Sequence, residues 1–382
     1  MMEPQPMKVA IVHDYLTQSG GAERVVEAFH EIWPDAPIFT SVYDADHTFK
    51  SFRQMDVRTS FLQKLPLAGT NRHHKKFLTL FPMAFEMLDL REYDLVISST
   101  SSFAKGIITY PHTCHVTYCH TPSRFAWRYR EYVDEGGFGK LERLLMPWVI
   151  HRLRAWDYLA AQRPDFFICN SDNVASRVEK FYRRNSVVVF PPVNTNRIQI
   201  VEKPTLDYWL CVSRFLGYKR VDLAVQAATK LGVRLKVVGS GPDESRLKAI
   251  AGPTVEFLGR VPDGEVEGLF GNCIGFLFPG EEDFGIAPIE AMAAGRPVVA
   301  YRAGGAIETV VEGVTGVFFD EPSVDSVAEA MQAVSKMDID PQRIRAHAET
   351  FGYDRFRLEM KTVIEQCLHD YRFRRQPSKM RS

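Results

Sequence analysis

The chain has 382 residues, more than one hydrophobic core usually serves, and this length predicts two domains. Its 47 basic residues balance 47 acidic residues, which excludes a general electrostatic attraction to nucleic acid. No apolar stretch is long enough to span a membrane, and "MMEPQPMK" is too short and polar for a signal peptide, so we expect a cytoplasmic protein. The six cysteines form no C-x-x-C pair and are interpreted as reduced core thiols.

The first predicted unit is a strand, a glycine loop and a helix. Residues 8–15, "KVAIVHDY", have the apolar character of a buried strand, and apolar residues recur at helical spacing after Gly21. Gly20 and Gly21 stand between the two elements without the G-x-G-x-x-G spacing of a dinucleotide site, which disfavours NAD. From the residues alone, this pair could equally be a helix-opening turn.

Residues 72–90, "RHHKKFLTLFPMAFEMLDL", place Arg72, Lys75 and Lys76 ahead of a strongly apolar run that includes Phe77 and Phe81. A basic segment with an apolar face can lie on an anionic membrane surface. It can also be a core helix with a solvated end. Both interpretations stay open at this point.

His120 follows a strand predicted at 115–120, and a preceding strand is expected near 94–98. Ligands of open α/β sheets lie at the carboxyl ends of the strands, so His120 is a candidate ligand contact. An isolated histidine at a strand end can also be purely structural. Its spacing from the neighbouring histidines is too irregular for a metal site.

Residues 140–163 are expected to form two helices broken at Pro147. A strand at 165–171 and a helix at 172–184 then complete a first domain of residues 1–192. The polar, proline-containing residues 193–205 are interpreted as a linker. From residue 206 strands and helices alternate, which predicts a second α/β domain with a doubly wound parallel sheet up to residue 352.

The stretch "EDFGIAPIEAMAAGRPVVAY", residues 282–301, follows an apolar strand and is expected to open a helix at Pro288 that stops at Gly295. The first N–H groups of a helix lack intrahelical partners and carry the positive end of its dipole, which predicts an anion site near Gly285. Glu282 and Glu290 frame this site, where they would read hydroxyl groups. Taken singly, Glu290 could simply be a glutamate in the first helical turn that the dipole favours, and Glu282 could lie in a solvated loop.

Arg214 ends the predicted strand 209–213, and Lys219 follows five residues later. Two cations at a strand end, beside an anion-binding helix, predict a diphosphate clamp in which arginine acts as a fork and lysine as a point charge. The later "GSGPDE" has Glu244 where a dinucleotide motif would need its third glycine, which again disfavours NAD.

The E-x7-E spacing with "FG" and "EAMAAGRPVV", the R-x4-K pair and "YCHTPSRFAW" resemble the retaining GT4-type glycosyltransferases of the GT-B fold, in particular the mannosyltransferases. The resemblance implies two Rossmann-like domains that face each other across a cleft. It also implies that a C-terminal segment, residues 353–382, crosses back to the first domain as a helix with a basic tail. We expect that tail to be disordered beyond Tyr371.

The resemblance implies roles for these residues in binding a nucleoside diphosphate sugar. Arg214 and Lys219 would stabilise the leaving diphosphate with no metal or other cofactor, and His120 and Glu282 would hold the sugar. Glu290 would bind the ribose hydroxyls. The residues expected to bind the donor are Gly20, Gly21, Arg260, Val261, Phe284, Gly285, Ile286, Ala287 and Glu290.

The implied activity is retaining transfer of a hexose, with mannose from GDP-mannose as the expected donor and UDP-sugars as the alternative. A glycan or a polyprenyl- or phospholipid-linked glycan is the expected acceptor, in cell-surface polysaccharide or glycolipid synthesis, with peripheral membrane contact through residues 72–90. Two other functional classes of protein are alternatives to a glycosyltransferase. A glycan phosphorylase would need a pyridoxal phosphate lysine and a far longer chain, and a non-catalytic nucleotide-sugar sensor would bind the donor without turnover.

Overall fold

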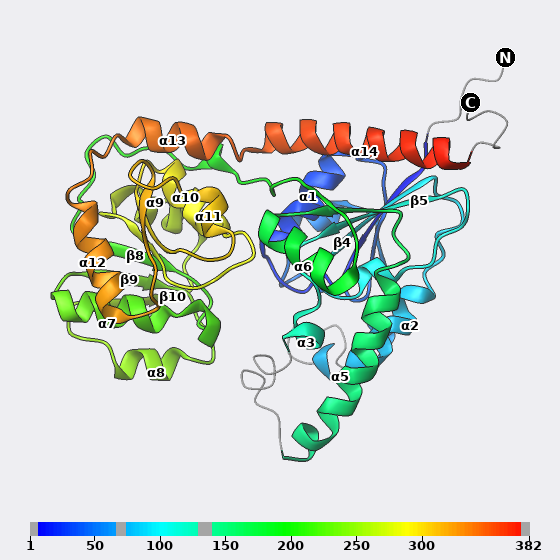
Figure 1. Ribbon diagram of the computed structural model, residues 1–382, viewed down its shortest axis with the longest axis horizontal. Coiled ribbons are helices and arrows are strands. Elements are labelled where there is room, and N and C mark those ends of the chain that lie inside the picture. The colour runs from blue at the N-terminus through cyan, green and yellow to red at the C-terminus, as the bar shows by residue number, and fades with distance from the viewer. Residues whose placement is uncertain (1–6, 66–73, 129–139, 376–382) are drawn as a thin grey trace. The chain divides into compact units, whose positions relative to one another are not determined.

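The computed structural model describes residues 7–65, 74–128 and 140–375 (Figure 1). The chain forms two compact units. The first comprises Met1–Pro191 together with Phe356–Ser382, and the second comprises Pro192–Arg355. Each unit is built on one parallel sheet with helices on both faces, of seven strands in the first unit and six in the second. The prediction of two Rossmann-like domains is confirmed.

The sheet of the first unit has the order β3-β2-β1-β4-β5-β6-β7, with every neighbouring pair parallel. Its central strands β1, β4 and β5 are buried along their whole length, because both faces of a parallel sheet are covered. The strands are β1 (Val9–His13), β2 (Ile38–Thr40), β3 (Val57–Thr59), β4 (Leu95–Thr100), β5 (Cys114–Cys119), β6 (Phe166–Cys169) and β7 (Val187–Val188).

Helices α1 (Gly21–Ile32) and α14 (Tyr353–Arg375) pack on the same face of this sheet. Phe29 of α1 stacks on Phe356 of α14 at 5.8 Å, and both rings meet the edge of Tyr118 from β5. Farther along α14, the Tyr371 hydroxyl contacts the carbonyl oxygens of Pro111 and Thr113 at 2.9 and 2.7 Å. Helix α14 continues to Arg375, so the expected disorder beyond Tyr371 is wrong for four residues, and the rest of the tail lies outside the described residues.

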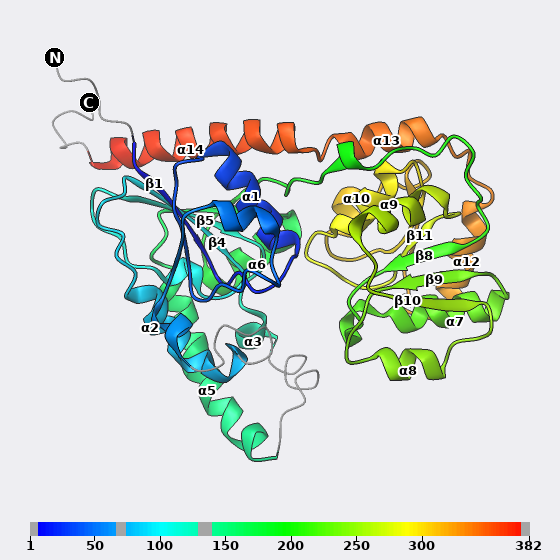
Figure 2. The same ribbon diagram turned by 180° about the vertical axis from the view of Figure 1, so that it is seen from behind.

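The opposite face is covered by α2 (Phe81–Glu86), α3 (Arg124–Trp127), α5 (Lys140–Ala160) and α6 (Asp172–Tyr182), and α2 and α5 run side by side in both views (Figures 1 and 2). The predicted break at Pro147 is wrong, because α5 is one helix with this proline inside it. A proline removes one backbone hydrogen bond, and Ile150 and Leu153 pack the following turns into the core, which holds the helix together. The short 3₁₀ segments are Lys50–Gln54, Phe61–Lys64, His74–Leu80 and Ala104–Gly106.

The sheet of the second unit has the order β10-β9-β8-β11-β12-β13. Helices α7 and α12 pack against one face, where Ala224, Ala228 and Met331 join the core, and α10 packs against α13 on the other face (Figure 1). The strands are β8 (Trp209–Val212), β9 (Leu235–Val238), β10 (Val255–Gly259), β11 (Phe276–Phe278), β12 (Val298–Tyr301) and β13 (Gly316–Phe319). The helices are α7 (Val221–Leu231), α8 (Glu244–Ala249), α9 (Asp263–Asn272), α10 (Ile286–Ala293), α11 (Ala306–Thr309), α12 (Val324–Val334) and α13 (Pro341–Glu349), with 3₁₀ segments at Thr195–Arg197 and Gly217–Lys219.

All six cysteines are free and buried, as expected for reduced core thiols. Within the described residues, none of the helices combines the length and the apolar character that crossing a bilayer requires.

Candidate functional site

Each sheet has one point where the strand order reverses, and ligands of open α/β sheets bind outside the carboxyl ends of the strands at that point. In the first unit the point lies between β1 and β4, and in the second it lies between β8 and β11. The loops that hold most of the predicted site residues begin at these strands or at their direct neighbours.

In the second unit, the structure joins two of the predicted residues directly. The ammonium of Lys219, which ends a 3₁₀ turn after β8, forms an ion pair with a carboxylate oxygen of Glu282, in the loop after β11. The side chains are 11% and 22% exposed, so the pair is partly shielded and reachable from solvent. A lysine at the sheet edge that is already held by a carboxylate can exchange that partner for a phosphate oxygen of a ligand.

Helix α10 begins two residues earlier than predicted, at Ile286, with Gly285 as its N-cap. Gly285 has a φ of 91°, and a Cβ atom there would lie 2.8 Å from the ring of Phe278, so only glycine fits without strain. The unpaired N–H groups of the first turn therefore begin at Ile286 and Ala287, and Pro288 is the third helical residue rather than the first. The start of this helix meets the geometric requirement of an anion site.

The earlier helix start also moves Glu290, which is the fifth helical residue and lies beyond the first turn where it was expected. Its carboxylate lies 3.6 Å from a guanidinium nitrogen of Arg197, which also pairs with Glu267 at 2.7 Å. Arg197 was not predicted as a site residue, because its segment has the composition of a polar linker and only the fold brings it to α10.

Three glycines that were not predicted as site residues fix the loop that carries Glu282. A Cβ atom on Gly280 would lie 2.7 Å from the carbonyl oxygen of Lys219. A Cβ atom on Gly304 or Gly305 would lie 2.2 or 2.3 Å from backbone atoms of Glu282 and Phe284, respectively. The Gly305 N–H also donates to the Glu282 carbonyl oxygen at 2.9 Å. The loops after β8, β11 and β12 therefore pack backbone to backbone.

The remaining predicted residues of this unit are Arg214, Arg260, Val261 and Phe284. Arg214 is exposed in the loop after β8. Arg260 and the half-buried Val261 follow β10 at the edge of the sheet, and the Arg260 guanidinium donates to the Ser240 hydroxyl at 2.9 Å. The Phe284 side chain is buried against Phe351, so only its backbone could face a ligand.

In the first unit, the buried carboxylate of Asp14 joins the loops after β1 and β4. It accepts the backbone N–H groups of Ser101, Phe103 and Ala104 at 2.6, 2.8 and 2.7 Å, and the Thr100 hydroxyl at 3.3 Å. Four donors to one carboxylate fix the turn that follows β4. Asp14 was not predicted as a site residue, because its hydrogen-bond partners are more than 80 residues away along the chain.

A second buried cluster, Glu23, His13, Ser99 and His120, is called the histidine network below. His13 Nδ1 lies 3.1 Å from both the carbonyl oxygen and the hydroxyl of Ser99, and the Ser99 hydroxyl lies 2.7 Å from His120 Nε2. Glu23 Oε1 lies 3.8 Å from His13 Nε2. Burial opposes the charged form of His13, but its interaction with Glu23, together with the Asp14 charge and the Ser99 carbonyl, raises the pKa of this imidazole.

His120 is thus placed at the end of β5, as predicted, and is 8% exposed. Its backbone is fixed on both sides, because its N–H donates to the Thr100 carbonyl at 2.8 Å and its carbonyl accepts the Asn170 amide at 3.0 Å. Gly20 is the N-cap of α1 and Gly21 its first residue. A Cβ atom on Gly20 would lie 2.8 Å from Glu23 Oε2, so this glycine also makes room for the histidine network.

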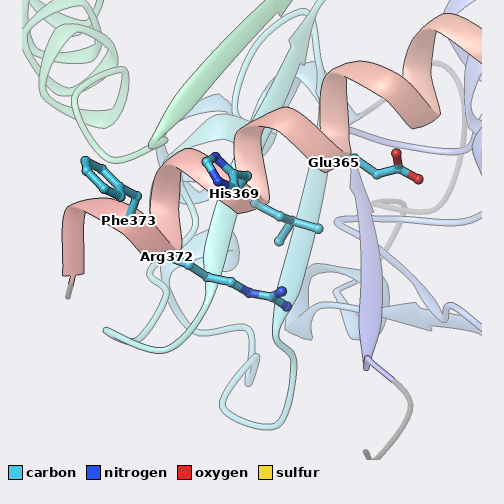
Figure 3. Close-up of a pocket in the computed structure, with 5 residues that line it drawn as sticks. Glu365, His369, Arg372 and Phe373 are labelled. Carbon is cyan, nitrogen blue, oxygen red and sulfur yellow. The ribbon is translucent and has the colours of Figure 1, made fainter. Parts of the chain in front are cut away.

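A separate hollow lies along the outer part of α14, far from the strand ends that carry these residues. Figure 3 shows its side chains spread along the helix instead of converging on one point. Because one helix supplies all the described lining residues, we do not assign a site to it. The lining residues are Glu365, Leu368, His369, Arg372 and Phe373. Across the described parts of the chain, no group of three or more histidine, cysteine or carboxylate side chains is arranged to hold a metal ion.

The comparison with protein families covers both units. A model described as glycosyl transferases group 1 matches residues 192–351, and a model described as glycosyltransferase family 4 matches residues 19–197. The chain is a GT4-type glycosyltransferase. The matches include the loops of Lys219, Glu282 and His120, so the resemblance seen in the sequence motifs is confirmed.

Individual relatives of this glycosyltransferase include mannosyltransferases. It is 25% identical over 361 residues to the alpha-1,3/1,6-mannosyltransferase ALG2 of Mus musculus, covering 82% of this chain and 84% of that protein. It is 34% identical over 165 residues to the GDP-mannose-dependent alpha-(1-6)-phosphatidylinositol monomannoside mannosyltransferase of Mycobacterium tuberculosis, covering 38% and 41%. The solved sucrose-phosphate synthase of Thermosynechococcus elongatus shares the fold, with a TM-score of 0.72, 17% identity and coverage of 96% and 100%.

Proposed function

We propose that this glycosyltransferase moves mannose from GDP-mannose, with retention of anomeric configuration, to a lipid-linked or other glycan acceptor. The Lys219–Glu282 pair beside the start of α10 carries this proposal, because it places an exchangeable cation and a hydroxyl acceptor next to an anion-binding helix terminus. Lys219 and Arg214 then stabilise the departing diphosphate, and Glu282 and His120 hold the sugar. Such preorganised donors are each worth about 3 kcal/mol of transition-state stabilisation.

The choice of mannose rests on similarity to relatives whose names include mannosyltransferase, one of them GDP-mannose-dependent. Thermal-shift measurements test it, because a ligand that binds only the folded state raises the melting temperature by mass action. We expect GDP-mannose to give a larger shift than UDP-glucose or ADP-glucose at equal concentration. A larger shift with a UDP-sugar would replace the donor in this proposal.

Binding without turnover would instead indicate a nucleotide-sugar sensor. Release of GDP from GDP-mannose, followed with and without added glycan acceptors, separates an enzyme from a sensor. The anomeric configuration of the mannosyl product, read by NMR, tests retention. An inverted product would contradict the retention of configuration in this proposal.

Membrane contact, predicted for residues 72–90, belongs to the same proposal. Arg72 and the side chains of Lys75 and Lys76 lie outside the described residues. Phe81, which was expected to help if exposed, is buried.

The exposed apolar side chains of this region belong instead to Met83 of α2 and Met87 just after it, which are 45% and 67% exposed, and to α5, where Trp148 is 61% exposed. We expect anionic vesicles to co-sediment the protein better than neutral ones, and salt to weaken the binding. Met87→Ser with Trp148→Ser should reduce it, whereas Leu358→Ser, on the 70% exposed Leu358 of α14, should not. Equal binding to both vesicle types would argue for a water-soluble acceptor.

A further inference from the structure

The histidine network contains a chain of hydrogen bonds whose direction can be worked out from its acceptors. The carbonyl oxygen of Ser99 can only accept a hydrogen bond, and it lies 3.1 Å from Nδ1 of His13. His13 Nδ1 must therefore carry a proton. The same N–H points toward the Ser99 hydroxyl oxygen, also at 3.1 Å, which accepts from it.

This arrangement decides where the proton of the Ser99 hydroxyl goes. Because the His13 N–H occupies one side of the hydroxyl oxygen, the O–H bond is directed to the other close partner, His120 Nε2, at 2.7 Å. His120 Nε2 then accepts a hydrogen bond and carries no proton. In a neutral imidazole the proton must in that case be on Nδ1.

The fold explains why these groups meet. His13 and Ser99 are register partners on adjacent parallel strands, so their side chains point to the same face of the sheet. Helix α1 covers this face, and Glu23 in its first turn reaches His13 Nε2. Glu23 is 1% exposed, and its Oε2 has no hydrogen-bond partner in the described structure. A buried carboxylate of this kind is stabilised by a cationic neighbour.

We propose that Glu23, His13 and Ser99 are positioning residues that hold the His120 ring as the Nδ1–H tautomer, so that His120 offers a donor, and not an acceptor, at Nδ1. A donor at this position suits an oxygen of the transferred sugar or its phosphate. Glu23 beside Nε2 and the Ser99 carbonyl beside Nδ1 favour the imidazolium form of His13, in which both ring nitrogens carry protons. The Nδ1–H of His13 thereby faces Ser99, and the Ser99 hydroxyl directs its own proton to His120. The identity of the bound oxygen rests on the proposed function, but the tautomer of His120 does not.

The direct test is ¹⁵N NMR of the full-length protein with labelled histidines, because the two ring nitrogens have different shifts in the two tautomers. The protein has 11 histidines, and the His120 signals are assigned by their loss in His120→Gln. We expect the Nδ1–H form in the wild type. We expect Ser99→Ala to convert it to the Nε2–H form or a mixture, whereas Ser99→Thr, which keeps the hydroxyl, should retain it.

An Nε2–H tautomer in the wild type, or an unchanged spectrum of folded Ser99→Ala, would overturn the inference. If Ser99→Ala does not fold, Glu23→Gln provides the second variant, since it keeps the shape of the side chain and removes its charge. We expect partial loss of the Nδ1–H form in Glu23→Gln, and full retention would contradict the role of Glu23.

Kinetics then separates this inference from the proposed function. Misplacing a group that holds the substrate typically costs up to about 100-fold in rate, so we expect kcat to fall about 10-fold or more in Ser99→Ala with a smaller change in KM. Ser99→Thr should recover most of the rate. If Ser99→Ala changes the tautomer of His120 but not kcat, the inference about the tautomer stands. The role of His120 in sugar transfer, which belongs to the proposed function, would then be refuted.

Discussion

Two lysine–carboxylate pairs, one in each unit, lie in opposite surroundings. In the first unit, Lys105 and Asp157 are 1% and 0% exposed, and the Asp157 carboxylate also accepts the Ser123 and Tyr182 hydroxyls and the Trp127 indole N–H, at 2.5, 2.8 and 2.8 Å. This pair joins α5 to its neighbours. In the second unit, Lys219 and Glu282 form a partly exposed pair between two loops. A lysine–carboxylate pair therefore joins elements of the fold where it is buried and hydrogen bonded to further side chains. A pair of the same kind at a strand end is available for ligand binding.

Removal of one member of the buried pair should produce the largest effect. Asp157→Ala leaves Lys105 charged and buried, and breaking such a pair typically costs about 3 to 5 kcal/mol of folding free energy. Urea unfolding followed by tryptophan fluorescence measures it.

Two controls belong to this experiment. Asp325→Ala removes the 71% exposed partner of Lys230 and should change stability by less than about 1 kcal/mol. Replacing both members of the buried pair, as Lys105→Met with Asp157→Leu, should restore much of the lost stability. Equal costs for Asp157→Ala and Asp325→Ala would contradict the distinction drawn between a buried and an exposed pair.

Removal of the cation at the strand end should affect turnover and not folding. Lys219→Ala and Arg214→Ala should each lower turnover about 100-fold or more, because each removes a preorganised charge from the leaving diphosphate. Steady-state rates with GDP-mannose, together with melting temperatures, measure both quantities. Lys230→Ala, on the exposed surface of the same unit, is the matched control and should be nearly silent. Near-normal turnover in folded Lys219→Ala would remove the ligand-binding role from this pair.

The smallest expected effect is that of a chelator. If Lys219, Arg214 and the start of α10 together neutralise the diphosphate, transfer needs no divalent cation, and excess EDTA should leave the rate unchanged. The measurement is turnover before and after EDTA, with Mn²⁺ or Mg²⁺ added back. Loss of activity that either ion restores would show that the protein cations are insufficient.

The sequence predicted most of the fold and the members of the site, but not how those members meet. The alternation of apolar strands with amphipathic segments predicts two parallel sheets, and Gly285 followed by Pro288 predicts a helix N-terminus. Both errors of helix position concern a proline. Helix α5 continues through Pro147 because Ile150 and Leu153 pack the following turns into the core, and α10 begins before Pro288 because Gly285 is already its N-cap.

The contacts within the site depend on sheet order, which local patterns do not contain. Lys219 meets Glu282 because β8 and β11 are neighbours, although α7, β9, α8, β10 and α9 separate these two strands along the chain. His13 meets Ser99 for the same reason, across 86 residues. A motif can therefore identify Lys219 or His120 as a candidate. The contacts of Lys219 with Glu282 and of His120 with Ser99 follow only from the fold, as do the places of Arg197 and Asp14.

The burial of all six thiols has a practical consequence for labelling the protein. Burial raises the pKa of Cys169, Cys211 and Cys273 to about 12 and that of Cys367 to about 11, and it raises the pKa of Cys114 as well. Only the thiolate reacts with maleimides and alkyl iodides. In the folded protein these cysteines are therefore unreactive for two reasons: their sulfur atoms are buried, and their thiols stay protonated. A single cysteine placed at the exposed Arg260 could therefore carry a fluorophore beside the expected nucleotide pocket in an otherwise unaltered chain.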